Sequence, residues 1–381
     1  MAIQINRAIP FFKINLIKWL KRTLLFGLLF LFTQCSDDQK TKNVFLITWD
    51  GYRWQELFSG ADSLLIGNKK YVGNLEELKN EFWHDDTKMR RKKLTPFIWS
   101  EIEKIGQIYG NRTIGSAVSI SNPHRFSYPG YSEILVGYVD ERIDSNKKMN
   151  NPNKTVLEII NEQPQFNGRV AAFGSWDVFP YIINEERSGI PVNAGFENAV
   201  GEGLTEMERS LNTIQSQLPK IWNTVRYDAF THHYAKEYIK KNKPNVVYIA
   251  YGETDDFAHD GDYEAYLKSA KQTDAFVKDL WEFVQSDEQY KDNTVFIITT
   301  DHGRGTDPID NWRNHGSKYE GTDQTWMIAW GAGIKAKGEV SNSVPIVANQ
   351  IASTIATILG INYESINEVG KPIDQILKVE R

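Results

Sequence analysis

Short apolar runs alternate along the chain with longer stretches in which apolar residues recur every three or four positions. The runs at 43–49, 245–250 and 295–299 are rich in β-branched residues, as is typical of strands buried on both faces of a sheet. The stretches at 227–241 and 262–285 have the spacing of helices instead. Because strands and helices alternate from residue 43 to about 360, the pattern predicts an α/β fold with a doubly wound, mostly parallel sheet flanked by helices.

The first 42 residues follow a different pattern. A basic stretch precedes an apolar run at 24–32, and the only cysteine of the chain, Cys35, follows that run. A run of this length is short for a bilayer span and indicates a signal peptide. The position of Cys35 resembles a bacterial lipoprotein signal, so we expect a lipoprotein-type signal peptide over 1–35, a lipid anchor at Cys35 and a polar tether over 36–42. The alternative is an uncleaved N-terminal membrane anchor. Both interpretations place the remaining chain outside the cytoplasm, in the periplasm or at the cell surface of a Gram-negative bacterium.

Composition narrows the class of protein. The chain is 41% hydrophobic and 24% charged, which fits a globular enzyme with a sizeable core. A net charge of −5 gives no sign of a nucleic-acid-binding surface. We expect residues 43–381 to form a single catalytic domain. The segment at about 178–225, rich in Asn, Gly and Glu, is expected to be an irregular insertion that shapes the substrate site.

Side chains able to bind metals follow the predicted strands. They are Asp50 after the first run, Asp255 and His259 after the second, Asp301 and His302 after the third, and the later His315. The carboxyl ends of parallel strands form the usual site of an open α/β sheet. Mixed Asp and His ligation suits zinc, or manganese where the coordination is richer in oxygen. The pattern predicts two divalent metal ions about 4 Å apart. His232 and His233, within a helical stretch, are expected to be structural or surface residues.

A serine lies where a phosphate group could bind. Ser127 comes just before a predicted helix that includes residues 131–136. The free N–H groups and the dipole at a helix start favour an anion there. Serine is also a common helix cap, so its position alone does not show a catalytic role.

Taken in order, these motifs resemble the alkaline phosphatase superfamily, and most of all its nucleotide pyrophosphatase/phosphodiesterase branch. The resemblance covers roughly residues 43 to 378. It is carried by Asp50, Ser127 two residues before Pro129, Gly137 at the helix end, Asp255-x-x-x-His259, Asp301-His302-Gly303 and His315-Gly316.

The resemblance implies a role for each of these side chains. One metal would take Asp255, His259 and His315, and the other would take Asp50, Asp301, His302 and the Ser127 oxygen. Ser127 would be the nucleophile that forms a phosphoserine. Asn146 would bind a phosphoryl oxygen, with Asn150 and Asn151 close by as alternatives.

The function implied is two-metal-dependent hydrolysis of phosphate esters or diesters, with a small phosphorylated substrate. Two positions depart from known branches. Pro129-Gly130-Tyr131 stands where many diesterases of this branch have Pro-Asn-His, and Tyr131 occupies the position of an arginine that sulfatases need. The alternatives are another phospho- or sulfo-transfer on the same scaffold, such as phosphoethanolamine chemistry, and a surface lipoprotein that binds a glycan or partner without catalysis.

Overall fold

The computed structural model describes residues 43–341, 344–365 and 367–377. The expected signal peptide, the lipid anchor at Cys35 and the tether therefore lie outside the described residues. The described residues belong to one compact unit. Among the described residues, no helix is both long enough and apolar enough to cross a membrane.

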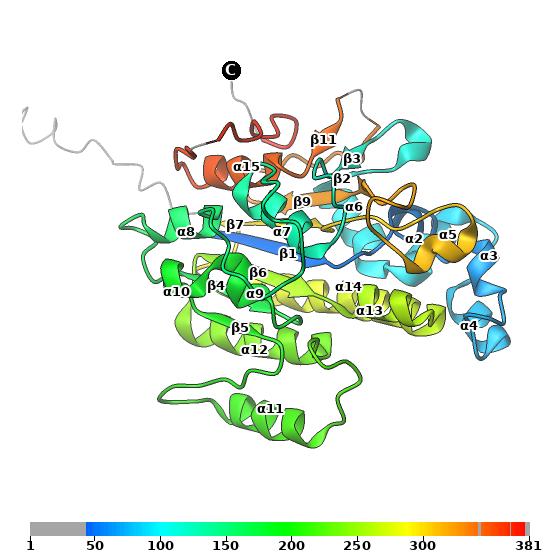
Figure 1. Ribbon diagram of the computed structural model, residues 1–381, viewed down its shortest axis with the longest axis horizontal. Coiled ribbons are helices and arrows are strands. Elements are labelled where there is room, and N and C mark those ends of the chain that lie inside the picture. Colours follow the sequence, from blue (N-terminus) through cyan, green and yellow to red (C-terminus); the bar gives the residue numbers. More distant parts are fainter. Residues whose placement is uncertain (1–42, 342–343, 366, 378–381) are drawn as a thin grey trace, which may run out of the picture. The chain divides into compact units, whose positions relative to one another are not determined.

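A sheet of eight strands runs through the centre of this unit (Figure 1). Its order is β10 (Gly338–Glu339), β2 (Gly106–Tyr109), β9 (Met327–Gly331), β7 (Thr294–Thr299), β1 (Asn43–Trp49), β6 (Val246–Tyr251), β4 (Val170–Gly174) and β5 (Val192–Ala194). The five strands from β7 to β5 are mutually parallel, whereas β9 is antiparallel to both β7 and β2. A small second sheet consists of β11 (Ile346–Val347), β3 (Val118–Ser119) and β8 (Gln324–Thr325).

Helices cover both faces of the large sheet, and β1 shows why. Its side chains alternate between two hydrophobic cores, with Phe45 and Ile47 in one and Val44 and Leu46 in the other. Successive residues of a strand point to opposite faces, so a wholly buried strand needs cover on both. The predicted doubly wound, mostly parallel α/β fold is therefore confirmed.

The helices divide between the two faces. One core takes buried residues from α2 (Trp54–Ser59), α3 (Ser63–Ile66), α4 (Leu75–Phe82), α5 (Thr87–Leu94), α12 (Asp228–Asn242), α13 (Glu253–Asp260) and α14 (Tyr263–Ser286). The other takes them from α7 (Ser127–Val136), α8 (Val156–Asn161), α9 (Phe179–Ile183) and α15 (Gln350–Ile358). Figure 1 shows α12 and α14 on one side of the sheet and α7 and α15 on the other. Shorter turns are the π-helix η1 (Ile98–Ile102), α6 (Glu103–Ile105), and the 3-10 helices η2 (Arg112–Ile114) and η3 (Ile309–Arg313).

The segment at 178–225 is more regular than its composition suggested. It contains α9, α10 (Glu185–Ser188), the edge strand β5 and α11 (Glu206–Gln217). Thr205 and Glu208 form a reciprocal capping box at the start of α11, a local signal that favours a helix there. Leu211 on α11 packs into the core beside α12, so tertiary burial also supports the helix. The expectation of an irregular segment was wrong for these elements.

Candidate active site

Three neighbouring strands place the acidic side chains together. β1 lies between β6 and β7 in parallel register, with Trp49 beside Tyr251 and Thr48 beside Thr299. Asp50 follows β1 directly, Asp301 follows β7 after one further residue, and Asp255 lies in the first turn of α13 after β6. Because these strands end at the same edge, residues that are distant in sequence meet there.

Asp50, Asp301 and His302 form the first group of possible metal ligands, which we call the acidic centre. One donor atom from each lies within 4.8 Å of the others. His302 Nε2 is 3.3 Å from Asp50 Oδ1 and 3.5 Å from Asp301 Oδ2. All three residues are buried. The same two carboxylate oxygens have no hydrogen-bond partner, which is costly inside a protein unless something binds them.

The opposite oxygens of these carboxylates are held in place. The Tyr131 hydroxyl donates to Asp50 Oδ2 at 2.7 Å, and the Gly51 N–H donates to Asp301 Oδ1 at 3.1 Å. Gly51 is required by space as well as by its positive φ of 56°, because a Cβ there would lie 2.7 Å from Asp255 Oδ1. The two unpartnered oxygens are thus oriented by their surroundings.

The electrostatics of the acidic centre favour a bound cation. Burial raises the pKa of Asp50 well above its usual range, and the charge of Asp255 raises it further. Burial likewise raises the pKa of Asp301, and Asp50 adds to that shift. Carboxylates this close repel one another when ionised, and a divalent cation between them would remove that repulsion. The donor set of two carboxylates and an imidazole fits a divalent metal such as zinc.

Asp255, His302 and His315 form a second group within 4.8 Å. His302 Nε2 lies 3.7 Å from Asp255 Oδ1, and His315 Nε2 lies 3.8 Å from the same oxygen. His259 adjoins this group, with its Nε2 2.9 Å from His315 Nε2 and 3.2 Å from Asp255 Oδ2. The structure therefore brings together every predicted ligand, and it places His302 beside both groups rather than one.

The protonation states in the second group suit metal binding. Burial lowers the pKa of His315, and nearby His302 lowers it further. A neutral imidazole keeps a nitrogen lone pair free for a metal. Burial opposes ionisation of Asp255, but Arg304, His259 and His315 together hold its pKa well below the usual range.

Ser127 was expected just before a helix, and it is the first residue of α7, with Phe126 at the N-cap position; its side chain is buried. Its Oγ lies 3.5 Å from His302 Nε2, so the hydroxyl reaches the ligand shared by both groups. Gly130 makes this approach possible, because a Cβ there would lie 2.2 Å from the Asp301 backbone oxygen. Gly137 ends α7 in a left-handed conformation, with φ 81°.

Asn146 lies beside the start of α7. Its Oδ1 accepts a hydrogen bond from the Tyr128 N–H at 3.0 Å, so the side chain caps one of the free donors of that helix start. This contact fixes the amide next to Ser127. Its expected contact with a phosphoryl oxygen stays a prediction.

Arg304 is a residue of the site that the sequence analysis did not identify. Its buried guanidinium donates to the backbone oxygens of Gly51 at 3.1 Å, Arg313 at 2.9 Å and Asp255 at 2.9 Å, and it also pairs with the Asp255 carboxylate. It thereby joins the loops after β1, β6 and β7 to the segment that precedes His315. The only signal in the sequence was its place directly after Asp301-His302-Gly303. Tyr131, noted there only as a departure from sulfatases, is the second such residue.

A family model described as Sulfatase matches residues 129–361, more than half of the chain. The chain belongs to the Sulfatase family. Its resemblance to the alkaline phosphatase superfamily is thereby confirmed, while the narrower nucleotide pyrophosphatase/phosphodiesterase branch stays a prediction. Asp50 and Ser127 precede the matched region, so their roles rest on the geometry described above.

The curated relatives bear the name of a transferase. GPI ethanolamine phosphate transferase 1 of Yarrowia lipolytica is 21% identical over 369 residues, which cover 89% of this chain and 34% of that protein. The human protein of the same name is 28% identical over 118 residues, covering 29% of this chain and 12% of that protein. This chain therefore spans about a third or less of the length of these relatives.

Solved structures share the fold at low sequence identity. The alkaline phosphatase PafA has a TM-score of 0.54 and 13% identity, with 88% of this chain and 98% of that chain covered. A 2-O GAG sulfatase has a TM-score of 0.54 and 12% identity, covering 88% and 73%. The lipoteichoic acid synthase LtaP of Listeria monocytogenes has a TM-score of 0.52 and 11% identity, covering 88% and 76%.

Proposed function

We propose that this protein is a metal-dependent hydrolase of phosphate esters or diesters that acts through a phosphoserine at Ser127. The observation that carries the proposal is the convergence of unpartnered, buried carboxylate oxygens and imidazoles beside a hydroxyl at a helix start. In the proposed arrangement Asp50, Asp301 and His302 hold one divalent ion near Ser127. Asp255, His259 and His315 hold the second.

Bound divalent cations in such a site lower the pKa of a nearby hydroxyl and withdraw charge from phosphate oxygens. The Ser127 oxygen gives up its proton to solvent and forms a bond to phosphorus, while the bond from phosphorus to the leaving oxygen breaks and that oxygen takes up a proton to leave as an alcohol. The start of α7 favours the negative phosphoryl group through its dipole. The Asn146 amide, held by the Tyr128 N–H, supplies donors on the same side. Water then attacks phosphorus, the bond to Ser127 breaks, and the serine regains its proton.

Transfer to an alcohol is a second candidate, favoured by the similarity of 89% of this chain to a GPI ethanolamine phosphate transferase. Attack of Ser127 on phosphorus is common to both reactions, and they differ in the group left on the serine and in whether water or an alcohol then accepts it. Sulfate ester cleavage has less support. Tyr131 stands at the position where sulfatases need an arginine, and its buried hydroxyl donates to Asp50.

A rate comparison tests the proposal. Zinc-loaded protein is assayed with p-nitrophenyl phosphate, bis-p-nitrophenyl phosphate and p-nitrophenyl sulfate, with and without added glycerol as an alcohol acceptor. Hydrolysis of one of the phosphate substrates, well above the sulfate rate and without need for the acceptor, supports a phosphohydrolase. Turnover that requires the acceptor favours transfer. If about two zinc ions are bound per chain and no substrate is turned over, both hydrolysis and transfer are refuted. A protein that binds no metal would instead support a surface lipoprotein that binds a ligand without catalysis.

We also propose that Cys35 carries a lipid anchor that holds this domain outside the cytoplasm, because a basic segment and then an apolar segment precede it, and only Thr33 and Gln34 lie between that apolar segment and Cys35. Cys35→Ser should release or misprocess the protein in fractionated cells. A mutant that stays in the membrane at the original processed mass fits an uncleaved anchor instead.

A further inference from the structure

A cavity of about 500 Å³ lies beside β5, the outermost of the parallel strands, whereas the acidic centre follows β1 and β7 inside the sheet. The lining residues of the cavity come from β4, β5, α10, α11, α12 and the segment between β5 and α11. Strands β4 and β6 separate β5 from β1, so the sheet alone places roughly 14 Å between β5 and β1. The volume falls within the range of small-molecule sites.

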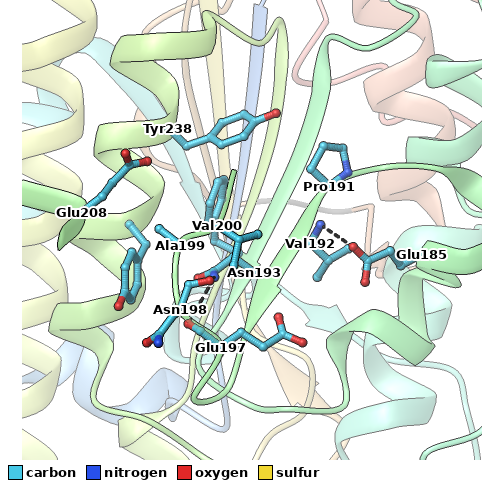
Figure 2. Close-up of a pocket in the computed structure, with 12 residues that line it drawn as sticks. Glu185, Pro191, Val192, Asn193, Glu197, Asn198, Ala199, Val200, Glu208 and Tyr238 are labelled. Atoms are coloured by element: carbon cyan, nitrogen blue, oxygen red, sulfur yellow. Dashed lines mark hydrogen bonds between the residues drawn. The ribbon is translucent and has the colours of Figure 1, made fainter. Parts of the chain in front are cut away.

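Most of the side chains that line the cavity are aromatic or apolar. They are Phe173, Tyr234, Tyr238, Pro191, Val192, Ala199 and Val200. Phe173 and Tyr238 contact each other edge to face, with ring centroids 5.4 Å apart. In Figure 2 the Tyr238 ring lies across the cavity from Glu197. Such a lining accepts the apolar body of a ligand and the face of a cation.

The charged side chains that line the cavity are all acidic. They are Glu185, Glu197 and Glu208, and no lysine, arginine or histidine is among the lining residues. Lys241 approaches Glu208 to 4.0 Å from outside the lining. Arg226 lies beside the cavity, but its guanidinium donates to Thr231 Oγ1 and to two backbone oxygens. Even with both cations counted, three carboxylates leave an excess of negative charge.

All three carboxylates also have a structural role, and that of Glu208 is to accept from the Thr205 N–H in the capping box of α11. Glu185 Oε1 accepts from the Val192 N–H at 3.2 Å, drawn in Figure 2, and Glu197 Oε2 accepts from the Ala194 N–H at 2.9 Å. They cover donors on β5, the outer strand, which argues against an added peptide strand. Each carboxylate keeps a second oxygen, and a structural cap alone does not require a negative charge.

We propose that this cavity binds a small organic ammonium compound with an apolar body, separately from the active site. The ammonium group would lie between the carboxylates, and the apolar body would rest on Tyr238 and Phe173. A matched pair of probes tests this assignment. Phenethylamine is protonated at neutral pH, whereas 2-phenylethanol has the same body and no charge. Calorimetric titration of each into the full-length protein measures the contribution of the charge.

Two variants localise the binding. Val200 is 84% exposed and lines the cavity, so Val200→Trp should fill it without disturbing the core. Its control is Leu64→Trp, at a position 66% exposed on α3. Glu197→Gln removes a charge yet keeps an oxygen for the Ala194 N–H, and its control is Glu282→Gln on the exposed surface of α14.

We expect phenethylamine to bind at least about tenfold more tightly than 2-phenylethanol, and each cavity variant to weaken it roughly tenfold while its control does not. Asp301→Asn should bind the amine as wild type does. The assignment is overturned if millimolar phenethylamine gives no saturable heat, if the alcohol binds equally well, or if the cavity variants bind unchanged. Binding that is lost in Asp301→Asn and kept in Val200→Trp would move the amine to the metal ligands and also overturn it.

Discussion

Two buried histidines, His302 and His232, show how differently the same side chain can be used. His302 lies in the acidic centre, where two carboxylate oxygens have no hydrogen-bond partner. His232 on α12 has both ring nitrogens engaged, with Nδ1 3.0 Å from the Tyr251 hydroxyl and Nε2 2.9 Å from Asp279 Oδ2. Its ring stacks on Phe276 at 4.3 Å, and Lys236 pairs with the same Asp279.

The two histidines differ in whether the polar atoms around them have hydrogen-bond partners. Both ring nitrogens of His232 have one, and burial lowers the pKa of its imidazole although Asp279 opposes that shift. In the acidic centre, burial and then neighbouring carboxylates raise the pKa values of Asp50 and Asp301. A buried cluster that is complete without a ligand stabilises the fold, whereas an incomplete one implies a bound partner. The predictions below test this contrast, from the largest expected effect to the smallest.

Asp301→Asn should have the largest effect. Turnover should fall by orders of magnitude, because a metal ligand is lost next to Ser127. The metal-free variant should nevertheless melt at a higher temperature than metal-free wild type, since one of the repelling carboxylates is neutralised. Calorimetry with and without zinc measures both states. A metal-free variant less stable than wild type would contradict the electrostatic account of the acidic centre.

Arg304→Lys should weaken metal affinity about 10–100-fold, because a lysine cannot donate to Gly51, Arg313 and Asp255 together. Turnover should recover as zinc is raised, since no ligand has been removed. Zinc titrations followed by activity distinguish this outcome from a catalytic defect. A loss of turnover that saturating zinc does not restore would show a direct role for Arg304 in the reaction.

His232→Ala should destabilise the protein by about 2–3 kcal/mol while leaving zinc content and turnover per folded molecule unchanged. The reason is the loss of the buried stack on Phe276 and of two hydrogen bonds. His233→Ala is the matched control, because His233 is exposed on the same helix. Chemical denaturation and metal analysis test the pair. Loss of zinc from His232→Ala would contradict the structural role of His232 and indicate that it supports metal binding.

Glu253→Gln should change only the pH dependence of stability. Burial, and then the charge of Asp228, raise the pKa of Glu253 to about 8 from the ordinary value of 4.5. A carboxyl with a raised pKa in the folded state stabilises the protein below pH 4.5, and that contribution is lost as the pH rises towards 8. Between pH 5 and 8, metal-free wild type should therefore lose more stability than the variant. The reverse order in melting temperatures would contradict the assigned shift.

The carboxylates of the site could be predicted from the sequence, because they follow the predicted strands. Apolar runs locate β1, β6 and β7, and the geometry of parallel sheets then brings Asp50, Asp255 and Asp301 to one edge. The hydrogen bonds that depend on tertiary packing could not be predicted from the sequence. Arg304 contacts Gly51 across 253 positions, and the Tyr131 hydroxyl reaches Asp50 only because Gly130 lets α7 approach.

The regular structure in 178–225 was missed for a related reason. Only three of the twelve residues of α11 are apolar, so periodicity alone does not indicate the helix, which its packing against α12 and its capping box support. The resemblance places His302 with Asp50 and Asp301, and spacing along the chain did not show that its Nε2 also lies 3.7 Å from Asp255 Oδ1.

Covalent labelling of Ser127 tests the central claim most directly. Wild-type and Ser127→Ala proteins, both zinc-loaded, are mixed with an activated phosphate ester, quenched in acid and digested for mass spectrometry. We predict one added phosphoryl group on the wild-type peptide that contains Ser127. The variant should show no such label and no turnover, while its zinc content and melting temperature match wild type. Near-normal turnover in Ser127→Ala would contradict the account, because water rather than Ser127 would then be the attacking group.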